Sequence, residues 1–123
     1  MNGIQETGLC IVRLSHKLNC QKHCIEVCKI KELLSPVEPN IKYYMESIKC
    51  EGFFHRKDAQ NYLANYVIPD NCEELYRDVY NRKELYYVDT AVFEIYQKSF
   101  PEERITLKKL KAEVFSQFNV PTT

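Results

Sequence analysis

Apolar residues in this chain recur at intervals of three and four, and little in the sequence interrupts them. The 123 residues include only three glycines and five prolines, so few positions force a turn. Intervals of three and four bring side chains to one face of an α-helix, which has about 3.6 residues per turn. The pattern predicts an all-α fold, a single compact domain over residues 1–123 with about five to seven amphipathic helices.

Six stretches carry this spacing and are expected to be helical. The first forms either one long helix or two shorter ones that separate near residues 15–19. Asp70 and Glu73 have the spacing of a capping box at a helix start. Thr106 is placed as the N-cap of the last helix. The six stretches are residues 9–34, 41–52, 57–69, 70–80, 84–101 and 105–121.

The charges of the chain balance, with 17 lysines and arginines against 17 aspartates and glutamates. A neutral balance provides no overall field toward nucleic acid or an anionic membrane. The apolar run at residues 9–12 is too short for a signal peptide, and no stretch approaches the length of a membrane helix. We therefore expect an intracellular protein, cytoplasmic or nuclear, that does not associate with membranes.

Six cysteines are the most unusual feature of the composition, and three of them lie in the segment CQKHCIEVC at residues 20–28. On a helix these three share an arc with apolar residues, which favours thiols packed in a reduced core. Three cysteines on one straight helix do not converge on a tetrahedral zinc ion, so no cofactor is expected. Disulfides are one alternative. Zinc is the other, and its ligands would be Cys20, Cys24, Cys50 and His55.

The chain has nine tyrosines and no tryptophan. Tyr43, together with Tyr86 or Tyr87, falls outside the apolar helical stripes. We expect these tyrosines to be exposed and to belong to an interface, where tyrosine is enriched. The tyrosines at apolar helical positions are assigned to the core: Tyr44, Tyr62, Tyr66, Tyr76 and Tyr96.

The C-terminal segment ITLKKLKAEVFSQFNVPTT, residues 105–123, is typical of the first helix and turn of a helix-turn-helix motif. The recognition helix that would enter a major groove does not follow it. The chain is therefore either a whole domain or a fragment that stops at the start of a further C-terminal element. Lys108, Lys109 and Lys111 form a basic edge, which either contacts phosphates or is simply solvated.

No catalytic signature occurs in the sequence, and three glycines are too few for phosphate-cradling loops. We therefore expect a non-enzymatic helical protein–protein interaction module, a regulator or adaptor whose composition would also fit a viral or host-modulating protein. Its partner would be another protein or a second copy in a homodimer. The first alternative is a nucleic-acid-associated domain with the helix-turn-helix-like C-terminal segment. The second is a zinc-stabilised Cys/His helical domain.

Overall fold

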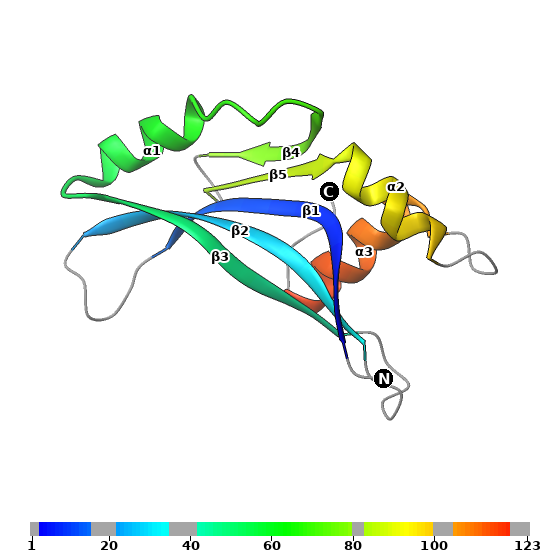
Figure 1. The fold of residues 1–123 in the computed structure, drawn as a ribbon. Coiled ribbons are helices and arrows are strands. Elements are labelled where there is room, and N and C mark those ends of the chain that lie inside the picture. The colour runs from blue at the N-terminus through cyan, green and yellow to red at the C-terminus, as the bar shows by residue number, and fades with distance from the viewer. Residues whose placement is uncertain (1–2, 16–21, 35–41, 80–82, 100–104, 119–123) are drawn as a thin grey trace.

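The computed structural model describes residues 3–15, 22–34, 42–79, 83–99 and 105–118. They form a five-stranded antiparallel sheet with three short helices, so the all-α helical prediction is wrong (Figure 1). The strands are β1 (Gly3–Ser15), β2 (His23–Leu34), β3 (Lys42–Phe53), β4 (Cys72–Asp78) and β5 (Glu84–Asp89). The helices are α1 (Arg56–Ala64), α2 (Thr90–Lys98) and α3 (Leu107–Gln117).

The strand order in the sheet is β3-β2-β1-β5-β4. The first three strands form a meander, and β4 and β5 form a second antiparallel pair that joins the meander through β1. The first strand of the chain therefore lies at the centre of the sheet. Among the described strands, β3 and β4 are the two edges.

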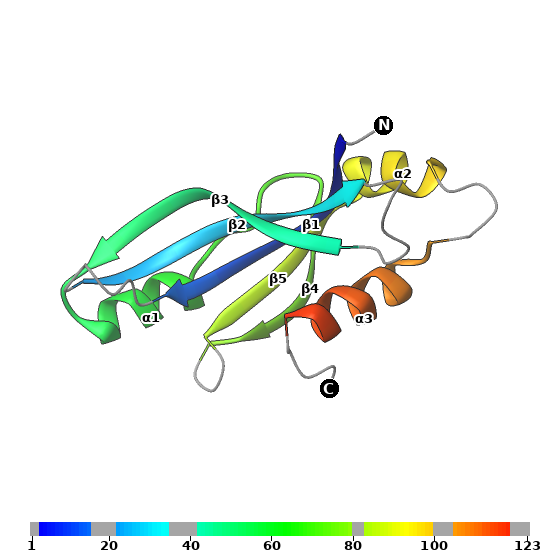
Figure 2. The same ribbon diagram turned by 90° about the horizontal axis from the view of Figure 1, so that it is seen from below.

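Two apolar clusters, one on each face of the sheet, hold the helices in place. α1 packs on one face, which we call the α1 face, through Ala59 and Leu63. α3 packs on the other, the α3 face, through Leu110, Val114 and Phe115. Both views show α1 at one end of the long strands and α2 and α3 at the other (Figures 1 and 2). The strands contribute Cys10, Val12, Ile25, Val27, Leu85 and Tyr87 to the α1 face, and Leu9, Ile11, Ile30, Tyr43 and Tyr86 to the α3 face.

The cysteine segment explains why helices were predicted for residues 9–34. Cys24 and Cys28 are four positions apart, which brings side chains to one face of a helix and, because four is even, also to one face of a strand. Both are buried in β2. Leu9 to Val12 are buried one after another, because β1 is central and has packing on both faces. The stretch therefore forms the antiparallel strands β1 and β2.

Two further predicted helices, and part of a third, are strands. Residues 41–52 lie mostly in β3, residues 70–80 contain β4, and the first part of 84–101 is β5. Asp70 and Glu73 do not begin a helix, because Glu73 is the second residue of β4. In these segments the strands carry apolar residues on both faces, and the resulting spacing also fits an amphipathic helix.

The helices predicted at residues 57–69 and 105–121 are confirmed, with shorter bounds. α1 ends earlier than expected, with Asn65 at its C-cap. Thr106 is the N-cap of α3, as predicted, and its side chain accepts a hydrogen bond of 3.2 Å from the Lys109 backbone nitrogen. Of the three described helices, none combines the length and the apolar character that crossing a bilayer requires.

A bulge in β1 lets α2 pack against the sheet. The pairing of β1 with β2 shifts register over residues 6–10, where the Thr7 hydroxyl donates a 2.8 Å hydrogen bond to the Ile30 carbonyl oxygen. Gly8 has a φ of 84°, in the left-handed region that favours glycine. A Cβ atom at this position would lie 2.8 Å from the backbone oxygen of Asp89. Glycine is therefore required where the start of α2 meets β1.

Candidate functional site

The three tyrosines assigned to an interface lie in the core. Tyr43, Tyr86 and Tyr87 are 6%, 0% and 3% exposed, so the exposure expected of them is not observed. The ring centroid of Tyr86 lies 4.6 Å from that of Phe115 on α3. Burial is the main cause that raises the pKa of all three phenols above its ordinary value. These side chains therefore stay protonated and act in packing.

The suggested zinc ligands do not form a cluster in the part of the chain that the structure describes. Cys20 lies outside the described residues. Cys24 is buried, whereas Cys50 and His55 are exposed. No group of three or more histidine, cysteine, aspartate or glutamate side chains within the described ranges is arranged to hold a metal ion.

The basic edge lies on α3. Lys108 and Lys109 are exposed, and Lys111 is half-buried. The opposite side of the helix packs against the sheet through Leu110 and Val114. Residues 119–123, which would continue a helix-turn-helix motif, lie outside the described residues.

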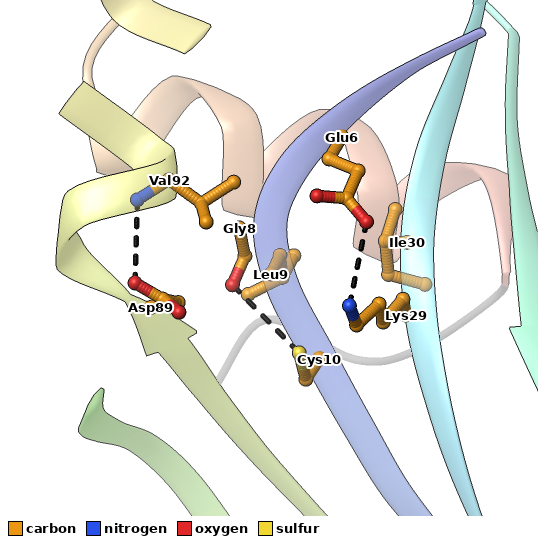
Figure 3. A pocket seen from close by; sticks show the side chains of 8 residues that line it. All are labelled: Glu6, Gly8, Leu9, Cys10, Lys29, Ile30, Asp89 and Val92. Atoms are coloured by element: carbon orange, nitrogen blue, oxygen red, sulfur yellow. Dashed lines mark hydrogen bonds and ion pairs between the residues drawn. The ribbon is translucent and has the colours of Figure 1, made fainter. Parts of the chain in front are cut away.

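A small pocket lies under the β1 bulge (Figure 3). Its volume is about 40 Å³, which leaves room for only a few water molecules. Glu6 and Lys29 form an ion pair of 3.3 Å at its border, and the Cys10 sulfur lies 3.8 Å from the Gly8 carbonyl oxygen (Figure 3). Burial is the main cause that raises the pKa of Cys10 to about 11. A protonated thiol is a poor nucleophile, so this pocket has the character of a packing gap.

A larger hollow lies between the edge strand β3 and the helix α1, and we call it the β3–α1 groove. Its volume is about 590 Å³. β3 forms one side of it, and α1 with the segment that follows α1 forms the other. The lining residues are Lys49, Phe53, Asp58, Asn61, Tyr62, Asn65, Tyr66 and Val67.

Aromatic rings form the floor of the β3–α1 groove. The ring centroids of Phe53 and Tyr62 are 5.3 Å apart, and those of Tyr62 and Tyr66 are 6.3 Å apart. Val67 is 85% exposed and lines the groove together with these rings. Lys49 adds a cation, and the phenol oxygen of Tyr62 is the main cause that raises the pKa of this lysine. The groove therefore suits a ligand with an apolar side chain and a neighbouring acceptor.

The outer edge of β3 runs beside this groove. β3 has twelve residues and pairs with β2 on one side, while no described strand pairs with its other side. Residues 46–50 are exposed. Ile48 occupies the register shift between β2 and β3 and is 49% exposed. Main-chain donors and acceptors on such an edge can pair with another extended chain.

The groove is not evident in the sequence, because Tyr62, Tyr66 and Val67 fit one helical stripe. Asn65 was an available signal, since asparagine is common where helices end. A helix that stops there leaves Val67 outside any stripe.

Comparison of this chain with family models, with curated proteins and with solved structures finds no match.

Proposed function

We propose that this protein is a non-enzymatic protein–protein interaction module that binds an extended segment of another protein as an additional strand on β3. The observation that carries the proposal is a twelve-residue edge strand that runs beside an aromatic groove. In strand addition, main-chain hydrogen bonds supply affinity and pockets for alternate side chains supply specificity. The edge of β3 and the β3–α1 groove are suited to these two roles.

The groove indicates which side chain the partner would carry. Side chains of an added strand alternate between the two faces of the sheet. Those on the α1 face would lie over Phe53 and Tyr62, where an apolar or aromatic side chain is removed from water. Val67, which also lines the groove, would contact the same side chain of the partner. We therefore expect the partner segment to present at least one large apolar residue.

The other edge of the sheet is a weaker candidate. β4 has seven residues, and its pairing with β5 shifts register between Glu74 and Tyr76. Glu73 and Glu74 are exposed on it. A short, bulged and charged edge is the usual protection against unwanted pairing. β3 also carries charges, a register shift at Ile48, and a Tyr43 backbone nitrogen that donates to the Gln117 side chain of α3 at 2.9 Å. It is nevertheless the longer strand, and it adjoins the groove.

The buried titratable side chains support a binding role over a catalytic one. Cys10 is a thiol whose pKa is raised to about 11, and the pKa values of the tyrosines Tyr86 and Tyr96 are also raised, mainly by burial. Groups held in their protonated form away from solvent make poor nucleophiles and bases. They are suited to packing.

The experiment is selection of a displayed library of random linear peptides against the whole chain. Val67→Asp places a charge in the groove, and we expect it to weaken the selected peptides by about tenfold or more, because a lost apolar contact costs about 1.4 kcal/mol or more. Ile95→Asp is the matched control, since Ile95 is an apolar side chain of α2 that is 67% exposed outside the groove.

Amide hydrogen exchange provides the second readout. A bound peptide that extends the sheet slows exchange along β3, whereas a peptide that only fills the groove leaves that edge unchanged. Peptides that bind Val67→Asp and the unsubstituted chain equally would contradict the proposal. Concentration-dependent self-association that Val67→Asp abolishes would instead assign the edge to a second copy of the chain.

Nucleic-acid association is the alternative function. The exposed side chains of Lys108 and Lys109 on α3 favour it, while the balanced net charge does not. Binding of this kind weakens steeply with salt, because phosphate contacts release counterions. Anisotropy of labelled single-stranded and duplex oligonucleotides at low and moderate salt tests it. Binding that Lys108→Gln and Lys109→Gln together remove would support this alternative.

A further inference from the structure

A second hollow lies at the end of the sheet where β1 ends, β2 begins and α1 starts. Its volume is about 320 Å³. Its lining contains three basic side chains, a hydroxyl and an apolar side chain, and no acidic side chain. We call it the basic pocket, and its lining residues are Leu14, Ser15, His23, Arg56 and Lys83.

The fold brings these basic residues together from separate segments. His23 begins β2 and pairs with Phe53, the last residue of β3, and α1 starts soon afterwards with Arg56. Lys83 is held beside β1 because its carbonyl oxygen accepts a 3.1 Å hydrogen bond from the Leu14 nitrogen. Backbone pairing therefore brings these residues to one end of the sheet.

Asp58 lies in the first turn of α1, and Glu84 follows Lys83. Among the described residues, however, the ion pairs join other basic residues to their partners, and none of them includes Arg56 or Lys83. The start of α1 adds to the positive potential, since the side chain of its N-cap, His55, makes no capping hydrogen bond. In this turn the Asp58 backbone nitrogen already donates to the His55 carbonyl oxygen at 3.1 Å, so an anion would depend on the amides of Arg56 and Lys57.

The Ser15 hydroxyl provides an independent indication of a ligand. Its oxygen is buried and has no hydrogen-bond partner among the described residues. Buried hydroxyl groups almost always have a partner, so one without a partner calls for an explanation. Because the oxygen has no surface open to solvent here, rotation about χ1 would bring it to an anion in the basic pocket.

We propose that the basic pocket binds a phosphate dianion, either free phosphate or the phosphate group of a monoester. Such a group carries close to two negative charges at neutral pH and presents three or more acceptor oxygens. Two cationic donors, Arg56 and Lys83, and one hydroxyl match that charge and that number of acceptors. A carboxylate, with one charge and two oxygens, would leave part of the basic lining without a counter-charge. This inference is independent of peptide binding at β3.

The test is a titration of the whole chain with inorganic phosphate and with phenyl phosphate at constant ionic strength, followed by amide NMR shifts and by calorimetry. We expect saturable binding, with shifts centred on the lining residues. Arg56→Gln and Lys83→Asn should each weaken binding by about tenfold or more, since each removes a charge-assisted hydrogen bond. Asparagine suits position 83 because Lys83 has a φ of 60°.

Lys57→Gln is the matched control. Lys57 follows Arg56 in the first turn of α1, is exposed, and does not line the pocket. Equal weakening by Lys57→Gln and Arg56→Gln would overturn the proposal, because binding would then follow net charge alone. Absence of saturation, or equally tight binding of the diester dimethyl phosphate, would also overturn it. Binding of phenyl phosphate but not of inorganic phosphate would support it and assign a monoester as the source.

Discussion

The hydroxyl of Tyr43 donates a 2.9 Å hydrogen bond to the carboxylate of Glu113, which ties the start of β3 to α3. The same hydroxyl lies 3.4 Å from that of Tyr96 on α2. We expect Tyr43→Phe to lower the free energy of unfolding by about 1–2 kcal/mol, because a partly buried hydrogen bond to a carboxylate is lost while the ring remains. Urea unfolding measures this. Tyr44→Phe is the control and should change stability by less than about 0.5 kcal/mol, since Tyr44 is only half-buried.

Glu32 should make the protein less stable as the pH rises from the ordinary pKa of a glutamate toward the raised pKa of this side chain. It is 3% exposed, one of its oxygens has no hydrogen-bond partner among the described residues, and burial is the main cause that raises its pKa. Between its ordinary pKa and the raised pKa, the folded state binds more protons than the unfolded state, so stability falls with increasing pH. Glu32→Gln should flatten this part of the pH profile of urea unfolding, and Glu94→Gln, at an exposed position on α2, should not. An unchanged profile in Glu32→Gln would contradict the assignment.

Gly8→Ala should destabilise the protein by about 2–4 kcal/mol, the sum of a left-handed backbone cost and a steric clash. The new Cβ would lie 2.8 Å from the backbone oxygen of Asp89 and 2.8 Å from the backbone nitrogen of Phe93. Gly3→Ala is the matched control, because its Cβ would meet only a Leu34 methyl carbon at 3.9 Å. Denaturant unfolding distinguishes the two variants. Similar stabilities would show that α2 can move away from β1 at little cost.

Thiol labelling should separate Cys50 from Cys10. Cys50 is exposed, whereas Cys10 is buried and its pKa rises from 9.0 to about 11. The thiolate fraction of Cys10 at neutral pH is therefore about a hundredfold lower than without this shift. With iodoacetamide and mass spectrometry, we expect Cys50 to be alkylated first and Cys10 only after denaturation. Equal rates in the folded protein would mean that β1 opens readily.

The spacing of apolar residues could identify α3 but not the sheet. Leu107 and Leu110 are three positions apart, an odd interval that would put them on opposite faces of a strand, so a helix is the better explanation. Cys24 and Cys28 are four positions apart, which fits both structures equally. Leu9 to Val12 form an unbroken apolar run, which a centrally placed strand also produces.

The β3–α1 groove and the basic pocket depend on contacts that a linear pattern does not contain. Arg56 and Lys83 meet only because β1 pairs with both β2 and β5. The exposed side chain of Val67 can be recognised only once α1 is known to end at Ala64. The sequence allows residue types to be assigned to a core or a surface. It does not show which residues from distant segments become neighbours in the fold.

The central position of β1 has a consequence for synthesis on the ribosome. β2 and β3 emerge soon after β1, but β5 is made much later, and α3, which shares an apolar cluster with Leu9 and Ile11, is made later still. Closing such distant contacts is slow. α1 follows β3 and can cover part of one face of the nascent meander, but the α3 face stays uncovered until α3 is made, and uncovered strands of this kind tend to aggregate. Chaperones are therefore expected to hold the growing chain between the emergence of β3 and that of α3.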